Sequence, residues 1–338
     1  MAYGDVSTRF VIYMFEGTII IVLNVLVCVT VLATKTLRKR KEYILVVALA
    51  IVDGWNGMAN FTAGAHRSYL IYTDRANRTV PAWQCFTIYN SMWMFGTSTA
   101  AGMLAVISVD RLLAVTLPMR YRNFANKFVL KECAVAYAYG LCWFVICVSF
   151  MVRGRHNQVS ALCVSSTLLV DYAWLGFTYY AMNGLIVLGS VLLYIPVVVV
   201  QEVRIRSKKR AEKKAKRGLA VAPVRKIYTV GANSTSIQLT TTTTKAASMS
   251  KQLQQQLLRQ RRMVITFAMS ALITFTCVVL TLIAQAVMQK VLTAAQRQLA
   301  STLIHMVTNL NPIANFFLYS LRHKEFKSTL VQMFRKSQ

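Results

Sequence analysis

The chain has 338 residues, of which 56% are hydrophobic and 15% are charged, and its formal net charge is +28. A soluble domain of this length needs more polar surface, so the composition excludes a soluble globular protein and indicates a chain that crosses a membrane several times. The high positive charge on its own would also fit a nucleic-acid-binding protein. The placement of the basic residues along the chain decides between these two classes.

Seven apolar segments are long enough to cross, as helices, a hydrocarbon core about 30 Å thick. The segments are uninterrupted rather than alternating, so we expect helices and not the strands of a barrel. The first segment is too long for a cleavable signal peptide and is followed by basic residues. The expected fold is an all-α membrane protein, a bundle of seven transmembrane helices within residues 10–321, with spans at 10–34, 43–65, 84–116, 132–152, 172–201, 263–287 and 299–321.

The Lys and Arg residues are concentrated in the loops on one side of these spans. If the N-terminus lies outside, 31 basic residues fall on the cytoplasmic side and 8 on the outer side. Without the long loop 204–262 the balance is still 15 to 8. The positive-inside rule therefore predicts an extracellular N-terminus, residues 1–9, and a cytoplasmic tail, residues 322–338. The same distribution makes nucleic acid a weak alternative partner.

Two cysteines fall on the outer side of the membrane. Cys85 lies at the start of the third span, and Cys163 lies in the loop before the fifth. Because this side is oxidising, we expect a disulfide that ties the loop across the mouth of the bundle. Asn77-Arg78-Thr79 is a glycosylation sequon in the exposed loop 66–82.

Polar residues recur inside the spans, where an unpaired charge is costly. Asp53 lies in the second span, and Asp110 and Arg111 are adjacent near the inner end of the third. A buried aspartate must be paired, protonated or bound to a cation, although the Asp110-Arg111 pair alone would also fit a surface anchor of a helix. The other landmarks are Asn24, the run Ala114-Val115-Thr116-Leu117-Pro118-Met119-Arg120-Tyr121, Trp143, Pro196, Asn311 and Asn315.

In this order the residues resemble the landmarks of the rhodopsin-like (class A) G-protein-coupled receptors, and the run from Asp110 to Tyr121 is the most specific match. The resemblance implies a multi-pass plasma-membrane receptor that binds an extracellular ligand and activates a heterotrimeric G protein through an outward movement of the sixth helix. It places the coupling switch at Asp110, Arg111 and Tyr319, with Arg111 paired to Asp110 at rest. It assigns a transmembrane polar network to Asn24, Asp53, Asn311 and Asn315.

The seventh span allows two alignments with the family's Asn-Pro-x-x-Tyr element. One begins at Asn311-Pro312 and puts Asn315 where the tyrosine belongs. The other reads Asn315-Phe316-Phe317-Leu318-Tyr319 and exchanges only the proline, and we favour it. Many relatives also hold a sodium ion beside the residue that matches Asp53, but Ala100 stands where they carry a serine, which weakens that expectation.

The sixth span departs from the family pattern. The family's Cys-Trp-x-Pro element aligns with Cys277-Val278-Val279-Leu280, so the tryptophan and the proline are both missing, and we expect a straighter helix. The inner end of this span, Gln260-Arg261-Arg262-Met263, offers no acid to pair with Arg111. The sequence therefore predicts a loose latch and measurable signalling without ligand.

The cytoplasmic loop 204–262 divides into parts of different composition. The basic stretch from Arg204 to Arg217 is expected to extend the fifth helix, as a lipid-facing anchor in the favoured interpretation or as a G-protein contact. The middle, with five threonines at 240–244, is expected to be disordered and, once phosphorylated, to recruit an arrestin-like partner. In the tail, a short amphipathic eighth helix is predicted, with one apolar face formed by Phe326, Leu330, Met333 and Phe334.

The class of ligand is constrained only by exclusion. Amine receptors carry an aspartate eighteen residues before the arginine, and this chain has Trp93 there, so an amine ligand is disfavoured. Opsins need a lysine in the seventh span, and residues 299–321 contain none, so retinal is excluded. A partly aromatic pocket is expected from Tyr89, Asn90, Trp93, Met94, Gln285, His305 and Asn309.

Other classes of membrane protein fit the sequence less well. The four histidines are scattered and no cluster of acids accompanies them, so neither an enzyme, nor a metal site, nor a cofactor is expected. A transporter or a channel is the alternative function. It is disfavoured because the chain shows no internal repeats and no polar stripes along several spans.

Overall fold

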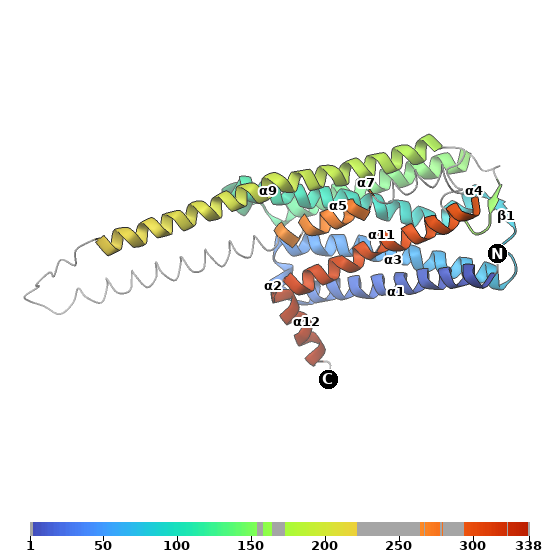
Figure 1. Cartoon of the computed structure of the whole chain (residues 1–338), viewed down its shortest axis with the longest axis horizontal. Helices are drawn as coiled ribbons and strands as arrows, with labels where there is room; N and C mark the ends of the chain where they lie inside the picture. Colours follow the sequence, from blue (N-terminus) through green and yellow to red (C-terminus); the bar gives the residue numbers. More distant parts are fainter. Residues whose placement is uncertain are drawn as a thin grey trace, which may run out of the picture.

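Long helices lie side by side as one bundle in the computed structural model, which describes residues 3–153, 158–163, 173–221, 264–266, 268–277, 279, 294–322 and 324–336 (Figure 1). We call the end that carries the two short strands the outer end, and the opposite end the inner end. The first residues of the chain lie at the outer end, and the C-terminus lies at the inner end. The long helices are α1 Tyr3–Ala33, α3 Lys41–Tyr72, α5 Ser91–Thr116, α7 Asn126–Arg153, α9 Ala173–Val221 and α11 Ala294–Arg322.

Five helices of the described residues are long and apolar enough to cross a membrane, at Thr8–Ala33, Lys41–Tyr72, Ser91–Thr116, Asn126–Arg153 and Trp174–Ser207. They coincide with the first five predicted spans. A shorter apolar helix, which we call the sixth-helix segment, covers Val264–Cys277, and α11 coincides with the seventh predicted span. The rest of the sixth span, up to residue 287, lies outside the described residues.

The predicted ends of the spans differ from those observed. Helix α3 continues to Tyr72, beyond the expected end at 65, because a helical backbone need not stop where the hydrocarbon does. The start of the third span is not regular α-helix, since residues 82–90 form the short helix α4 Ala82–Cys85 and the π-helical turn η1 Phe86–Asn90. Hydropathy predicts apolar length and not helix type, so it merged these pieces with α5.

Helices α1 and α3 touch through glycines. A Cβ atom added at Gly17 would lie 2.6 Å from the main-chain nitrogen of Phe61, and one added at Gly64 would lie 2.6 Å from the main-chain oxygen of Phe10. Both separations are too short for real carbon atoms, so only glycine fits at these positions. Small residues are how membrane helices approach closely without help from water. Helices α1 and α3 therefore form a fixed pair within the bundle.

The outer end is covered by a small β-hairpin and a disulfide. Strand β1, Thr79–Pro81, pairs antiparallel with β2, Gln158–Ser160, with Val80 opposite Val159. The disulfide joins Cys85 to Cys163, as expected from their placement on the outer side. The sequon residue Asn77 is exposed just before β1.

A buried arginine on α3 forms hydrogen bonds to the loop that contains β2 and Cys163. The Arg67 side chain, on α3, donates hydrogen bonds to the main-chain oxygens of Leu162 at 2.9 Å and Cys163 at 3.0 Å. Its guanidinium carbon also lies 4.9 Å from the ring centre of Tyr89, in cation–π range. The loop is thus tied to the bundle at Arg67 as well as at the disulfide.

Three short helices of the described residues lie at the inner end of the bundle. They are α2 Lys35–Arg38, α6 Pro118–Asn123 and α12 Lys324–Lys336, which turns away from the axis of α11 (Figure 1). Phe326 of α12 is fully buried, and Glu325 forms an ion pair with Arg40. The predicted amphipathic helix is therefore present, and its first turn packs against the bundle.

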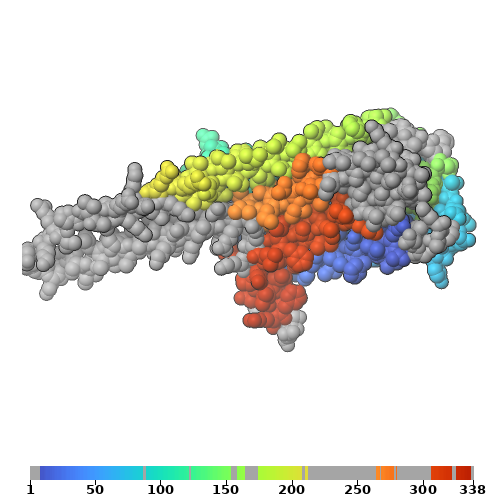
Figure 2. All heavy atoms as spheres, viewed as in Figure 1, coloured from blue at the N-terminus to red at the C-terminus, as the bar shows by residue number. Residues whose placement is uncertain are grey.

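Helix α9 projects well beyond the rest of the described bundle (Figures 1 and 2). Its 49 residues run to Val221, so the first part of the loop 204–262, residues 204–221, is helical and not disordered. The basic stretch does extend the fifth helix, as expected. The threonine run at 240–244 lies outside the described residues.

Candidate functional site

The site is centred on Asp110 and Arg111, near the inner end of α5. Both side chains are buried, with no exposed surface on Asp110 and 4% on Arg111. Consecutive residues of a helix point in different directions, but the long arginine folds back so that Nη2 forms an ion pair with Oδ2 of Asp110. The expected ion pair between Arg111 and Asp110 is therefore present, and burial makes each charge dependent on the other.

Tyr121 completes this pair from the short helix α6. Its hydroxyl donates to Asp110, 2.9 Å from Oδ1 and 3.2 Å from Oδ2, and lies 3.4 Å from Nη2 of Arg111. Burial raises the pKa of the Tyr121 phenol, so the group stays protonated and remains a donor. Tyr121 ends the run that resembles the receptor family, but no role was predicted for it because its distance from Asp110 depends on the turn between α5 and α6.

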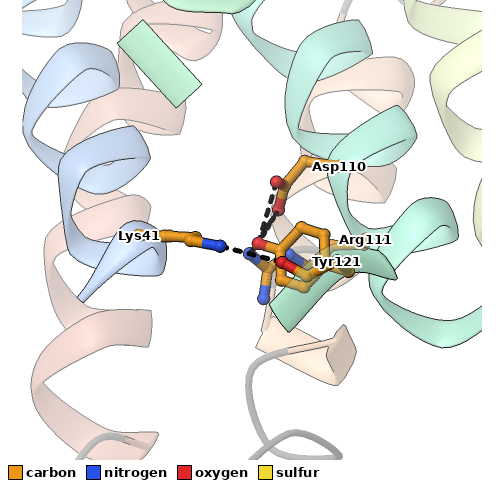
Figure 3. Close-up of polar contacts among 4 residues, drawn as sticks. All are labelled: Lys41, Asp110, Arg111 and Tyr121. Carbon is orange, nitrogen blue, oxygen red and sulfur yellow. Dashed lines mark hydrogen bonds and ion pairs between the residues drawn. The ribbon is translucent and has the colours of Figure 1, made fainter. Parts of the chain in front are cut away.

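Lys41 joins the same cluster from the start of α3. Its Nζ donates to the main-chain oxygen of Tyr121 at 2.8 Å and lies 4.7 Å from the centre of the tyrosine ring. Figure 3 shows these four side chains meeting between α3, α5 and α6. The contacts hold α6 against the inner ends of both long helices.

Further polar groups lie around Arg111. Glu42 on α3 and Glu132 on α7 lie within electrostatic range of the guanidinium. Within the described part of the chain, the buried Oε2 of Glu132 has no hydrogen-bond partner. The buried hydroxyl of Tyr194, on α9, is also within electrostatic range and makes no hydrogen bond of ordinary geometry to described residues, although Ser108 is nearby. Glu42 and Glu132 were not predicted because each follows a lysine near the end of a predicted span, as an ordinary surface charge would, and Tyr194 was not predicted because it lies in an apolar stretch.

The transmembrane polar network connects three of its four predicted members to neighbours on other helices. Asn315 on α11 donates to Oδ2 of Asp53 at 3.0 Å. Asn311, one turn earlier on α11, bonds to Thr274 of the sixth-helix segment at 2.9 Å. Asn24 is buried on α1 and donates to the main-chain oxygen of Ile20, so it is bonded within its own helix.

Tyr319 lies between this network and the charged cluster. It is buried on α11 and within electrostatic range of both Asp53 and Tyr194. Since Tyr194 in turn neighbours Arg111, polar groups on four helices extend from Asp53 to Arg111. Tyr319 therefore lies between the two groups of polar residues.

The predicted pocket residues occupy different surroundings. Tyr89 and Asn90 hold the outer loop, since the Tyr89 hydroxyl lies 2.9 Å from the main-chain oxygen of Leu162 and Asn90 Nδ2 lies 3.4 Å from that of Cys163. Met94 is buried in an apolar cluster with Trp143 and Tyr179, and Trp93 lies 6.5 Å from Tyr180 between ring centres. Gln285 lies outside the described residues, and His305 is described only as a position on α11.

Asn309, the last of these predicted pocket residues, belongs to a separate polar cluster. Its Oδ1 accepts from Asn60 at 3.1 Å, and its Nδ2 donates to Glu16 of α1 at 3.2 Å. Glu16 is an acid within the first span and was not singled out in the sequence. No other acid occurs in the predicted span 10–34, and an acid inside an apolar span is the signal by which the sequence could have identified Glu16.

Comparison with known proteins gave a match to a family of proteins but not to an individual curated protein. No curated protein matched this chain. A family model described as "7 transmembrane receptor (rhodopsin family)" matched residues 23–319, which is most of the chain. The match covers the switch, the polar network and both cysteines. The chain therefore belongs to the rhodopsin family of seven-transmembrane receptors, which are multi-pass signalling proteins of the membrane and not enzymes.

Proposed function

We propose that this receptor has its N-terminus outside the cell, binds an extracellular ligand and activates a heterotrimeric G protein through an outward movement of its sixth helix. The observation that carries the proposal is the buried cluster of Asp110, Arg111 and Tyr121 at the inner end of the bundle. A guanidinium in this position needs a partner at all times. A G protein that offers new contacts to Arg111 therefore stabilises the conformer in which Asp110 has released it.

The surroundings of Arg111 support a switch with two states. In the described state Arg111 is held by Asp110. The Glu132 carboxylate and the Tyr194 hydroxyl offer alternative partners to an arginine that turns away from Asp110. If the Arg111 guanidinium moves from one set of partners to another, the free-energy cost is lower than if it is buried without a partner. The free-energy difference between the two conformers is then small enough for a ligand to shift the equilibrium.

The test compares G-protein activation by the wild type and by Arg111→Ala in cells at matched surface expression. We expect Arg111→Ala to lose most of its activation, because alanine leaves Asp110 without its cation and the G protein without its contact. Arg38→Ala is the matched control, since Arg38 is an exposed arginine at the same end of the bundle, and it should retain activity. Equal activity of the wild type and Arg111→Ala would contradict the switch. Conductance or substrate uptake independent of G protein would favour a channel or a transporter.

The same assay measures signalling without ligand. Because the inner end of the sixth span has no acid to pair with Arg111, we expect basal activity above that of empty cells. Basal activity equal to that of empty cells, at matched surface expression, would contradict this expectation.

The ligand and the secondary partners belong to the same proposal. We place the ligand at the outer end, near Tyr89, Asn90, Trp93, Met94, Gln285, His305 and Asn309, and we expect neither retinal nor an amine held by an aspartate at position 93. We further propose that phosphates in the loop 204–262 recruit an arrestin-like partner. The carboxylate of Asp53 is the candidate position for a sodium ion, with the expectation weakened by Ala100.

A further inference from the structure

Two hydroxyl side chains of the sixth-helix segment face α11. Ser270 is fully buried, and its Oγ lies 2.5 Å from Oδ1 of Asn315. The Thr274 hydroxyl lies 2.9 Å from Oδ1 of Asn311. On each helix the two residues are four positions apart, which is one turn, so the hydrogen bonds lie one above the other. We call them the two rungs.

The rungs connect the sixth helix to the fixed part of the bundle. Asn315, which accepts the hydrogen bond from Ser270, donates through Nδ2 to Asp53 on α3 at 3.0 Å. Helix α3 is itself held to α1 by the glycine contacts described above. The sixth-helix segment lies between α9 and α11 on the face seen in Figure 2, so an outward movement has to separate it from α11.

The rungs are suited to being broken and re-formed. The Thr274 hydroxyl is also 2.9 Å from the main-chain oxygen of Ser270, so it keeps an acceptor within its own helix when Asn311 moves away. A serine hydroxyl has the same option toward the residue four positions before it. Hydrogen bonds between membrane helices are of modest strength, and the loss of one rung changes an equilibrium by about threefold.

We propose that Ser270 and Thr274 are the resting latch of the sixth helix, in the place of an ion pair between that helix and Arg111. The inner end of the span has no acid for such a pair, whereas the rungs lie farther along the same helix and are formed in the described state. The latch rests on the proposed function, because it acts on the helix whose movement activates the G protein. It adds Ser270 and Thr274 as positioning residues.

The test measures basal G-protein activation by Ser270→Ala, by Thr274→Val and by the double variant, at matched surface expression. We expect basal activity to rise about threefold for each single variant and further, to at most about tenfold, for the double variant, because each lost rung weakens the same contact between two helices. Thr276→Val is the matched control, since Thr276 is exposed on the same helix and, among the described residues, bonds to the main-chain oxygen of Leu272 within its own helix. Thr274→Ser, which keeps the hydroxyl, should behave as the wild type.

A second measurement separates the latch from the signalling role. Hydrogen exchange of the purified receptor should be faster at residues 268–277 in the double variant than in Thr276→Val. If the receptor activates G protein but neither basal activity nor exchange differs from Thr276→Val, the latch is refuted. If exchange rises while no variant and no wild type activates a G protein, the rungs hold the helix and the proposed function is what fails.

Discussion

At the level of single residues, the buried carboxylate of Asp110 depends on two partners of different kinds. Arg111 supplies the opposite charge, and Tyr121 supplies a neutral donor at 2.9 Å. A hydrogen bond to a charged group contributes about 1.5–3 kcal/mol, more than a neutral one, because the charge polarises the donor. Lys41 contacts the main chain and the ring of Tyr121, so it orients the tyrosine. The tyrosine hydroxyl is therefore the second fastening of the resting pair.

Replacement of Tyr121 by phenylalanine removes this hydroxyl and keeps the ring beneath Lys41. We expect basal signalling to rise severalfold, because the resting conformer loses a bond to a buried charge. Because burial raises the pKa of the phenol above that of an ordinary tyrosine, the hydroxyl loses its proton only at a pH well above the physiological range. The difference between Tyr121→Phe and the wild type should thus be the same at pH 6.5 and pH 8. Lys41→Met is the control for the ring contact, and a variant no more active than Lys41→Met would exclude the role of the hydroxyl.

At the level of elements, helix α12 is attached to the bundle by an apolar contact and by an ion pair. Phe326 has no exposed surface and belongs to the core cluster that includes Leu37 and Tyr43. The side chains of Arg40 and Glu325 keep 30% and 37% of their surface exposed, so solvent screens their attraction. A buried phenylalanine contributes about 3–5 kcal/mol relative to alanine, whereas an exposed ion pair contributes about 1 kcal/mol or less. The apolar contact is therefore the stronger attachment.

This comparison predicts different results for the two replacements. Phe326→Ala should lower the melting temperature of the purified receptor by several degrees, because it opens a cavity at the junction of α12 with the bundle. Glu325→Gln should change the melting temperature little. Thermal unfolding in detergent at low and at high salt measures both, and a larger effect from Glu325→Gln would show that the ion pair is the principal attachment.

At the level of the whole molecule, the bundle was predictable because hydropathy and the placement of charge act along the chain. The five long apolar helices, the extension of α9 and the disulfide all follow from that information. The contacts of Tyr121 with Asp110 and of Ser270 with Asn315 were not predictable, because they join segments whose relative rotation no sequence period specifies. The predicted third span likewise included η1 as regular helix, because hydropathy depends on the side chains and does not distinguish a π-helical turn from an α-helix.

The orientation of the whole chain has its own test. With the N-terminus outside, Asn77 lies on the extracellular side, exposed before β1. Asn77→Gln should then remove a glycan, seen as a loss of mass equal to that caused by enzymatic deglycosylation of the wild type. An epitope tag at the N-terminus should be stained on intact cells, and one at the C-terminus only after permeabilisation. Staining of the C-terminal tag on intact cells would show that the predicted orientation is wrong.

The length of α9 gives the receptor a mechanical property. Its 49 residues make a rod about 74 Å long, and the part after Ser207, where the apolar stretch ends, accounts for about 21 Å of it. A rigid rod that pivots at Ser207 converts rotation into displacement, so a tilt of about 10° moves its far end by about 4 Å. A fluorophore near Val221 would therefore report the angle of the fifth helix from a position outside the bundle, where the label disturbs no contact between the membrane-spanning helices.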